Sequence, residues 1–150
     1  MSKLKAKDSL YDTDPHAWYW AQAKKLRDGK TDEADLLHIA EELEDMGRSE
    51  AKELRSSLRL ILSHLLKWQH QPAKRSDSWR DTIDRERDHA ALSLEDSPSL
   101  QAKLPELFAK AYQLARKEAA RETKLALASF LETPPYTIKQ TLDPDYLPPP

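Results

Sequence analysis

The spacing of apolar residues along the chain is that of α-helices. It is clearest between Ser49 and Gln69, where apolar side chains recur three and four positions apart, as on one face of a helix. These positions are Leu54, Leu58, Ile61, Leu62 and Leu65. No comparable stretch alternates apolar and polar residues as a half-buried strand does. The pattern predicts an all-α fold with this segment as its strongest core helix.

Two more helices are expected before this segment. Asp14 is placed to cap a helix that has Pro15 in its first turn and ends near Gly29. A second helix is expected over Asp32–Met46. It should end at Gly47, because glycine is common directly after the last helical turn.

Two further helices and a short one are expected after the core segment. Ser78 and Asp81 resemble a capping pair for a helix reaching about Leu94. An alanine-rich helix follows Ser97 and Pro98, with Pro105 tolerable in its first turn. A short capped helix is expected at Thr137, since Gln140 follows three positions later.

The distribution of proline divides the chain. Six of the ten prolines lie between Pro134 and Pro150, which leaves the middle free for helices. We therefore predict an N-terminal extension over residues 1–13 and an antiparallel bundle of about five helices over residues 14–131. A Pro-rich C-terminal strap or tail is expected over residues 132–150.

Composition excludes several classes of protein. The 150 residues include no cysteine, so disulfide frameworks, thiolate zinc sites and cysteine nucleophiles are ruled out. Two glycines are too few for a phosphate-binding loop. The chain shows neither a standard export signal nor an uninterrupted run of about 18 apolar residues, so we expect a cytoplasmic protein with no membrane partner. No cofactor is indicated.

An acidic stretch over Thr31–Gly47 holds seven Asp and Glu residues and no Lys or Arg. On a helical wheel, one sector contains His38, Glu41, Glu42 and Asp45. The apolar residues of the same segment centre roughly 140° away at 100° per residue, so this sector should point out of the core. We predict a solvated or partner-facing acidic face, and no metal site.

A basic and aromatic stretch over Lys67–Arg80 is the local candidate for binding phosphate or nucleic acid. It combines Trp68, Trp79 and Arg80 with further cations, and such residues can hold phosphates and stack on bases. Equally, both rings could close one end of a helical bundle. The formal net charge of -2 disfavours nucleic-acid binding.

Charged residues also occur on faces that should be apolar. Glu118 and Glu122 fall inside the apolar stripe of the alanine-rich helix, and Glu86 or Arg87 falls inside that of the preceding helix. A bare buried carboxylate costs several kcal/mol, so these groups must be paired, protonated or ligand-bound. Two alternatives stay open: an ion-pair network using Arg55, Arg59 and Arg87, or a ligand site that includes His64, which is otherwise a half-buried packing residue.

Several segments resemble one known family. These are Glu-Glu-Leu-Glu-Asp-Met-Gly-Arg-Ser-Glu from Glu41, His-Leu-Leu-Lys-Trp-Gln from His64, Ser-Trp-Arg from Ser78 and Ala-Arg-Glu-Thr from Ala120. In this order and separation they resemble the domain-of-unknown-function 29 family of bacterial proteins. The resemblance covers nearly the whole chain and implies a bacterial helical protein. It implies no activity and no catalytic residues.

Three functional hypotheses follow. The leading one is a non-enzymatic interaction or regulatory module that binds an unknown protein partner or itself. The second is a small helical metal- or ligand-binding enzyme that uses Glu118, Glu122 and His64. The third is nucleic-acid or phosphate binding through Lys67–Arg80. The residues leave open whether the protein is an enzyme.

Overall fold

The computed structural model describes residues 10–150 and confirms the all-α helical bundle. Within these residues the regular structure is helical, with no strand. The elements are α1 (Leu10–Thr13), α2 (Pro15–Arg27), α3 (Leu36–His70), η1 (Pro72–Lys74), α4 (Asp77–Asp96), η2 (Pro98–Lys103), α5 (Leu104–Thr123), η3 (Leu127–Ser129) and α6 (Ile138–Leu142). In this range no helix is long and apolar enough to cross a membrane.

The chain forms two compact units, and their boundary falls inside α3. Unit 1 is Met1–Ser49 and unit 2 is Glu50–Pro150. Residues 1–9 of the predicted N-terminal extension lie outside the described residues, and the remainder of that extension contains α1. The predicted limits at residues 13/14 and 131/132 stay predictions.

Unit 1 contains α1, α2 and the first turns of α3. Asp14 caps α2 as predicted, because its Oδ1 accepts the amide of Ala17 at 3.1 Å. After α2 the backbone turns at Gly29, whose φ of +72° lies in the left-handed region that favours glycine. The predicted end of this helix is therefore confirmed.

The predicted break at Gly47 is wrong. A single helix, α3, runs without interruption over Leu36–His70, and Gly47 is helical within it. Glycine in a helix costs about 1 kcal/mol relative to alanine, and no proline nearby adds to that cost. The start at Leu36 also differs from the expected Asp32, because Asp32 to Ala34 form a turn instead.

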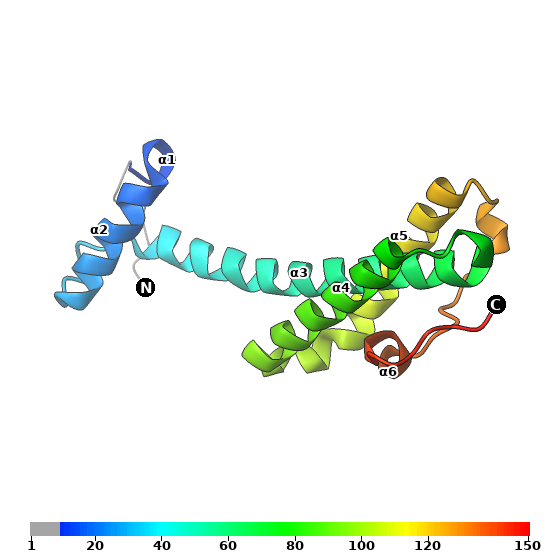
Figure 1. Ribbon diagram of the computed structural model, residues 1–150. Helices are drawn as coiled ribbons and strands as arrows, with labels where there is room; N and C mark the ends of the chain where they lie inside the picture. Colours follow the sequence, from blue (N-terminus) through cyan, green and yellow to red (C-terminus); the bar gives the residue numbers. More distant parts are fainter. Residues whose placement is uncertain (1–9) are drawn as a thin grey trace. The chain divides into compact units, whose positions relative to one another are not determined.

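In unit 2 the second half of α3 packs with α4 and α5 (Figure 1). Short connections make α4 antiparallel to α3, and α5 antiparallel to α4. The predicted core stripe is confirmed, since all five of its residues are fully buried: Leu54, Leu58, Ile61, Leu62 and Leu65. The same core also includes Ile83 and Ala90 of α4 and Ala111, Ala115 and Ala119 of α5.

Of the three features predicted for helix starts in unit 2, two are confirmed and the cap of α4 is wrong. The cap of α4 is Ser76, whose Oγ accepts the amide of Trp79 at 3.2 Å, and not the expected Ser78. Pro105 lies in the first turn of α5, where its missing N–H has no helical partner to lose. Thr137 and Gln140 form the expected capping box of α6.

Candidate functional site

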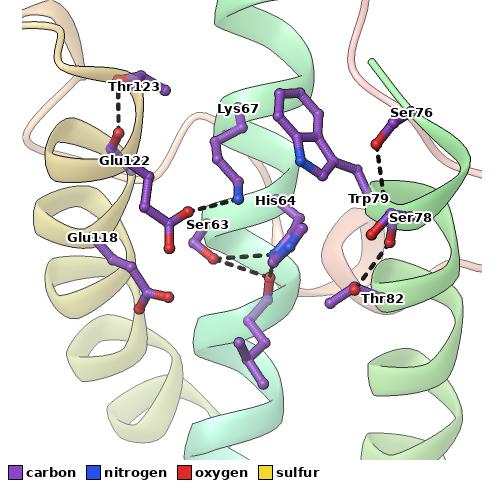
Figure 2. Close-up of polar contacts among 12 residues, drawn as sticks. Ser63, His64, Lys67, Ser76, Ser78, Trp79, Thr82, Glu118, Glu122 and Thr123 are labelled. Atoms are coloured by element: carbon purple, nitrogen blue, oxygen red, sulfur yellow. Dashed lines mark hydrogen bonds and ion pairs between the residues drawn. The ribbon is translucent and has the colours of Figure 1, made fainter. Parts of the chain in front are cut away.

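A polar cluster lies in unit 2 where α3, α4 and α5 meet. Lys67 of α3 places its Nζ 2.6 Å from Oε2 of Glu122 on α5 and 5.1 Å from the ring centroid of Trp79 on α4. Figure 2 shows the lysine between these two groups. Only 9% of the Lys67 side chain is exposed, so the carboxylate and the ring face compensate a nearly buried charge.

The second carboxylate of α5 is also paired. Glu118 forms an ion pair with Arg59 of α3, and both side chains are largely buried. These two pairs satisfy the charges that the sequence places on an apolar stripe. Arg59 belongs to the ion-pair network considered from the sequence, whereas Lys67 was not identified there as a partner of Glu122.

His64 lies in the same cluster, on α3 beside Ser63 and Lys67 (Figure 2). Its Nδ1 is 2.8 Å from the carbonyl oxygen of Leu60 and 3.3 Å from Ser63 Oγ. Burial lowers the pKa of His64, and the charge of Lys67 lowers it further. A neutral ring that donates Nδ1–H to the carbonyl leaves Nε2 as an acceptor, able to take a proton or a hydrogen bond from a ligand.

The rings of the two tryptophans in the basic stretch each lie against a cationic side chain of the same chain. The guanidinium of Arg75 lies 4.9 Å from the Trp68 ring centroid, and its Nε donates to the Trp68 carbonyl at 2.8 Å. Lys67 lies over Trp79 in the same way. Arg80 pairs with Asp84 at 3.1 Å, one turn further along α4.

Glu86 and Arg87, the two charged residues considered for the apolar stripe of α4, are both buried, but they have different partners. Arg87 donates from Nε to the Thr141 carbonyl at 2.9 Å and from Nη2 to the Tyr146 carbonyl at 2.9 Å. It therefore holds the C-terminal segment against α4, and burial lowers its pKa. Glu86 accepts from His89 and Arg85 at 3.3 Å each, beside a cavity of about 450 Å³.

In unit 1 the residues of the predicted acidic face have two kinds of surroundings: two contact neighbouring side chains and two are exposed. His38 contacts Asp35 at 2.7 Å and stacks on Tyr11 with 3.8 Å between ring centroids. Glu42 accepts the hydroxyl of Tyr11 at 2.9 Å, which raises the pKa of Tyr11 to about 12. By contrast, Glu41 and Asp45 are exposed.

Asp35 organises this part of unit 1. Its side chain is fully buried and accepts Trp18 Nε1 at 3.2 Å in addition to His38. Burial opposes its ionisation, but the hydrogen bonds from His38 and Trp18 outweigh that effect and lower the pKa of Asp35. The same contact raises the pKa of His38.

An apolar groove of about 520 Å³ lies between α2 and the first turns of α3. Its lining includes Trp18, Tyr19, Leu26, Ile39, Leu43 and Met46. Leu43 and Met46 are among the apolar residues of the acidic segment, whose side of the helix was expected to face the core, and for these two residues the expectation is wrong, because each is 63% exposed. Among the described residues of unit 1, the 13-residue helix α2 is the one long helix beside α3, and Leu43 and Met46 stay exposed next to it.

The chain was compared with known proteins. The model of a family described as "Domain of unknown function DUF29" matches residues 10–147. The chain belongs to this family. No curated protein and no solved structure matches it. The match spans both units of the DUF29 protein, including the groove and the polar cluster, and it assigns activity to neither.

Sequence reasoning missed two features of this DUF29 protein. The sequence presents Asp35 only as one of seven acids. Its contacts with Trp18 and His38 do not follow from the pattern of one helix. The groove was missed because a helical wheel shows that Leu43 and Met46 share a face, but not whether anything covers it. The acidic stretch around Leu43 and Met46 does not indicate from the sequence that these side chains are exposed.

Proposed function

We propose that this DUF29 protein is a non-enzymatic interaction module that binds a protein partner through the groove of unit 1. The observation that carries the proposal is the exposure of Leu43 and Met46, each 63% accessible, beside Leu26, which is 41% accessible. Clustered exposed apolar side chains at a groove are typical of interaction sites. A groove between two helices suits an amphipathic helix of the partner. The setting we propose is the bacterial cytoplasm.

The ion pairs and cation–ring contacts of the polar cluster and the basic stretch in unit 2 support the same proposal, because they are made within the chain. Glu118 and Glu122 are paired with Arg59 and Lys67. The rings of Trp68 and Trp79 lie against Arg75 and Lys67. These groups would have to exchange existing partners before they could bind a substrate or a base.

Oxidative footprinting of Met46 tests the proposal. A partner in the groove should slow Met46 oxidation several-fold when the full chain, at low concentration, is added to an extract of its bacterial source. The reference is the same concentration of purified chain in buffer. Leu43→Glu should abolish this protection, whereas Leu131→Glu, which changes a leucine that is 62% exposed in unit 2, should retain it. Equal oxidation in extract and buffer would rule the proposal out.

A second candidate function is anion binding at the polar cluster, favoured by the ammonium of Lys67 beside His64, whose Nε2 can accept a hydrogen bond from a protonated phosphate oxygen. Inorganic phosphate is the simplest probe. Binding should shift the NMR signals of the His64 ring and leave those of His38 unchanged. If millimolar phosphate moves neither ring, this candidate is eliminated.

A further inference from the structure

We propose a small-molecule site in unit 2, in the cavity of about 450 Å³ that residues of α3 and α4 line. Its ligand carries an ammonium group and hydroxyl groups, as amino sugars do. Because the cavity belongs wholly to unit 2, the inference goes beyond the proposed function and does not depend on it. The volume falls within the usual range of small-molecule pockets, roughly 300 to 1,000 Å³.

The lining of the cavity is rich in acidic and hydroxyl side chains. Two carboxylates, three serines and one imidazole come from two helices: Glu53, Ser56 and Ser57 from α3, and Glu86, His89 and Ser93 from α4. None of the lining residues is a lysine or an arginine, so the lining favours a cationic ligand. The described residues contain no group of three His, Asp or Glu side chains arranged to hold a metal ion, which favours an organic cation.

Glu86 is the buried carboxylate of this cavity. Its side chain is 9% exposed, whereas its partners Arg85 and His89 are 56% and 55% exposed. Both contacts measure 3.3 Å, longer than the roughly 2.7 to 2.9 Å of a strong charge-assisted hydrogen bond. An ionised carboxylate has about four acceptor positions, so Glu86 keeps capacity for further donors. An ammonium group in the cavity would use that capacity.

Ser57 supplies an independent indication of a ligand. It lines the cavity and is only 6% exposed, yet its hydroxyl makes no hydrogen bond to another residue of the described chain. Other buried hydroxyls of these helices bond to a carbonyl in the preceding turn. Ser63 donates to Leu60 at 3.2 Å, and Thr123 does so to Ala119 at 2.6 Å. Because buried polar groups nearly always have a partner, the exception points to a hydroxyl group supplied by a ligand.

These groups together select a ligand with both functions. The carboxylate of Glu86 accepts hydrogen bonds from an ammonium group, and the hydroxyl of Ser57 can both donate to and accept from a ligand hydroxyl. Leu60 and Leu92, which also line the cavity, would contact the carbon skeleton. A ligand with only an ammonium group would leave Ser57 unpaired, and a ligand with only hydroxyls would leave the charge of Glu86 unused.

Three six-membered ring compounds test this selection in the full chain. Glucosamine carries both functions, glucose lacks the ammonium group, and cyclohexylamine lacks the hydroxyls. NMR titration follows the amide signals of Ser57 and Glu86 at a pH at which both amines are protonated. We expect glucosamine to bind at millimolar concentration and the other two about ten-fold more weakly. Absence of any shift with glucosamine at tens of millimolar, or equal binding of either control compound, overturns the inference.

Substitutions separate ligand binding from folding. Ser57→Ala should be at least as stable as wild type, because the hydroxyl has no partner in the described chain and alanine favours a helix, yet it should bind glucosamine several-fold more weakly. Glu86→Gln should weaken binding about ten-fold. Asp88→Asn makes the same charge change at an exposed residue of α4 outside the cavity and should bind as wild type. Unchanged glucosamine binding in Ser57→Ala or in Glu86→Gln overturns the inference.

Discussion

At the scale of single residues, two histidines of α3 lie in opposite electrostatic settings. His38 contacts the ionised, buried Asp35 at 2.7 Å, which stabilises its charged form. His64 is buried near Lys67, which destabilises its charged form. Both residues were singled out from the sequence, but the direction of each shift depends on neighbours that the sequence does not place.

NMR titration of the imidazole signals should show this contrast. The pKa of His38 should lie above the ordinary value of 6.5 and that of His64 below it. Asp35→Asn should bring His38 back toward 6.5 and leave His64 unchanged. Finding His64 with the higher pKa of the two would contradict the described contacts.

The same shifts set the direction of pH effects on stability. Because the pKa of His38 is raised on folding, its stabilisation is complete below pH 6.5 and is lost as pH rises through the folded pKa. Because the pKa of His64 is lowered, the unfolded chain binds that proton more readily. Unit 2 should therefore lose stability as pH falls below 6.5, and His64→Gln should reduce that loss when hydrogen exchange of α5 amides is followed against pH.

The pair of Lys67 and Glu122 should respond unequally to removal of either partner. Glu122→Met leaves a nearly buried ammonium with only a ring face, whereas Lys67→Met leaves a carboxylate that is 46% exposed and can be hydrated. We expect Glu122→Met to cost roughly 1 to 3 kcal/mol of unfolding free energy and Lys67→Met less. Hydrogen exchange of α5 amides measures both, and the reverse order would contradict this account.

At the scale of elements, the sequence predicted three helix ends that depend on a local side-chain cap or a positive-φ glycine. Asp14, Gly29 and Thr137 each act locally, so the local pattern was sufficient. Gly47 resembled such an end but lies within α3, where a methyl group added to it would meet no other atom within 4 Å. The polar cluster was predicted only in part. Helical wheels identified Glu118 and Glu122, but they could not show that Lys67 lies opposite Glu122.

Gly47→Ala should stabilise α3 locally. An added methyl group meets no neighbour in the chain, and alanine favours the helix over glycine by roughly 0.5 to 1 kcal/mol. Amide exchange around Gly47 should slow roughly two- to five-fold at low protein concentration. Ala40→Gly, in the same exposed part of α3, should accelerate exchange by a similar factor. Faster exchange in Gly47→Ala would contradict an uninterrupted helix.

Arg87→Met should release the C-terminal segment. The substitution removes hydrogen bonds to the carbonyls of Gln140, Thr141 and Tyr146, each with a charged donor. Amides of α6 should then exchange at least ten-fold faster, while those in the first half of α4 change little. Arg80→Met, on the same helix but paired with Asp84, is the control and should leave α6 protected.

At the scale of the whole molecule, the two units differ in how completely they bury their apolar residues. Unit 2 has a continuous core from α3, α4, α5 and the C-terminal segment, although leucines such as Leu131 are exposed, whereas the described part of unit 1 buries few apolar residues and leaves Leu43 and Met46 in solvent. Helical periodicity predicted the apolar face of each unit. It could not predict which face a second helix covers, since that depends on the short length of α2 and the chain's path through Gly29.

The most direct test of this account is whether a partner protects Met46 at the groove of unit 1. Wild-type Met46 should be oxidised several-fold more slowly in an extract of the bacterial source than in buffer, and Leu131→Glu should behave as wild type. Leu43→Glu should lose this protection. Equal oxidation of wild-type Met46 in extract and in buffer, or equal protection in Leu43→Glu, would contradict the account.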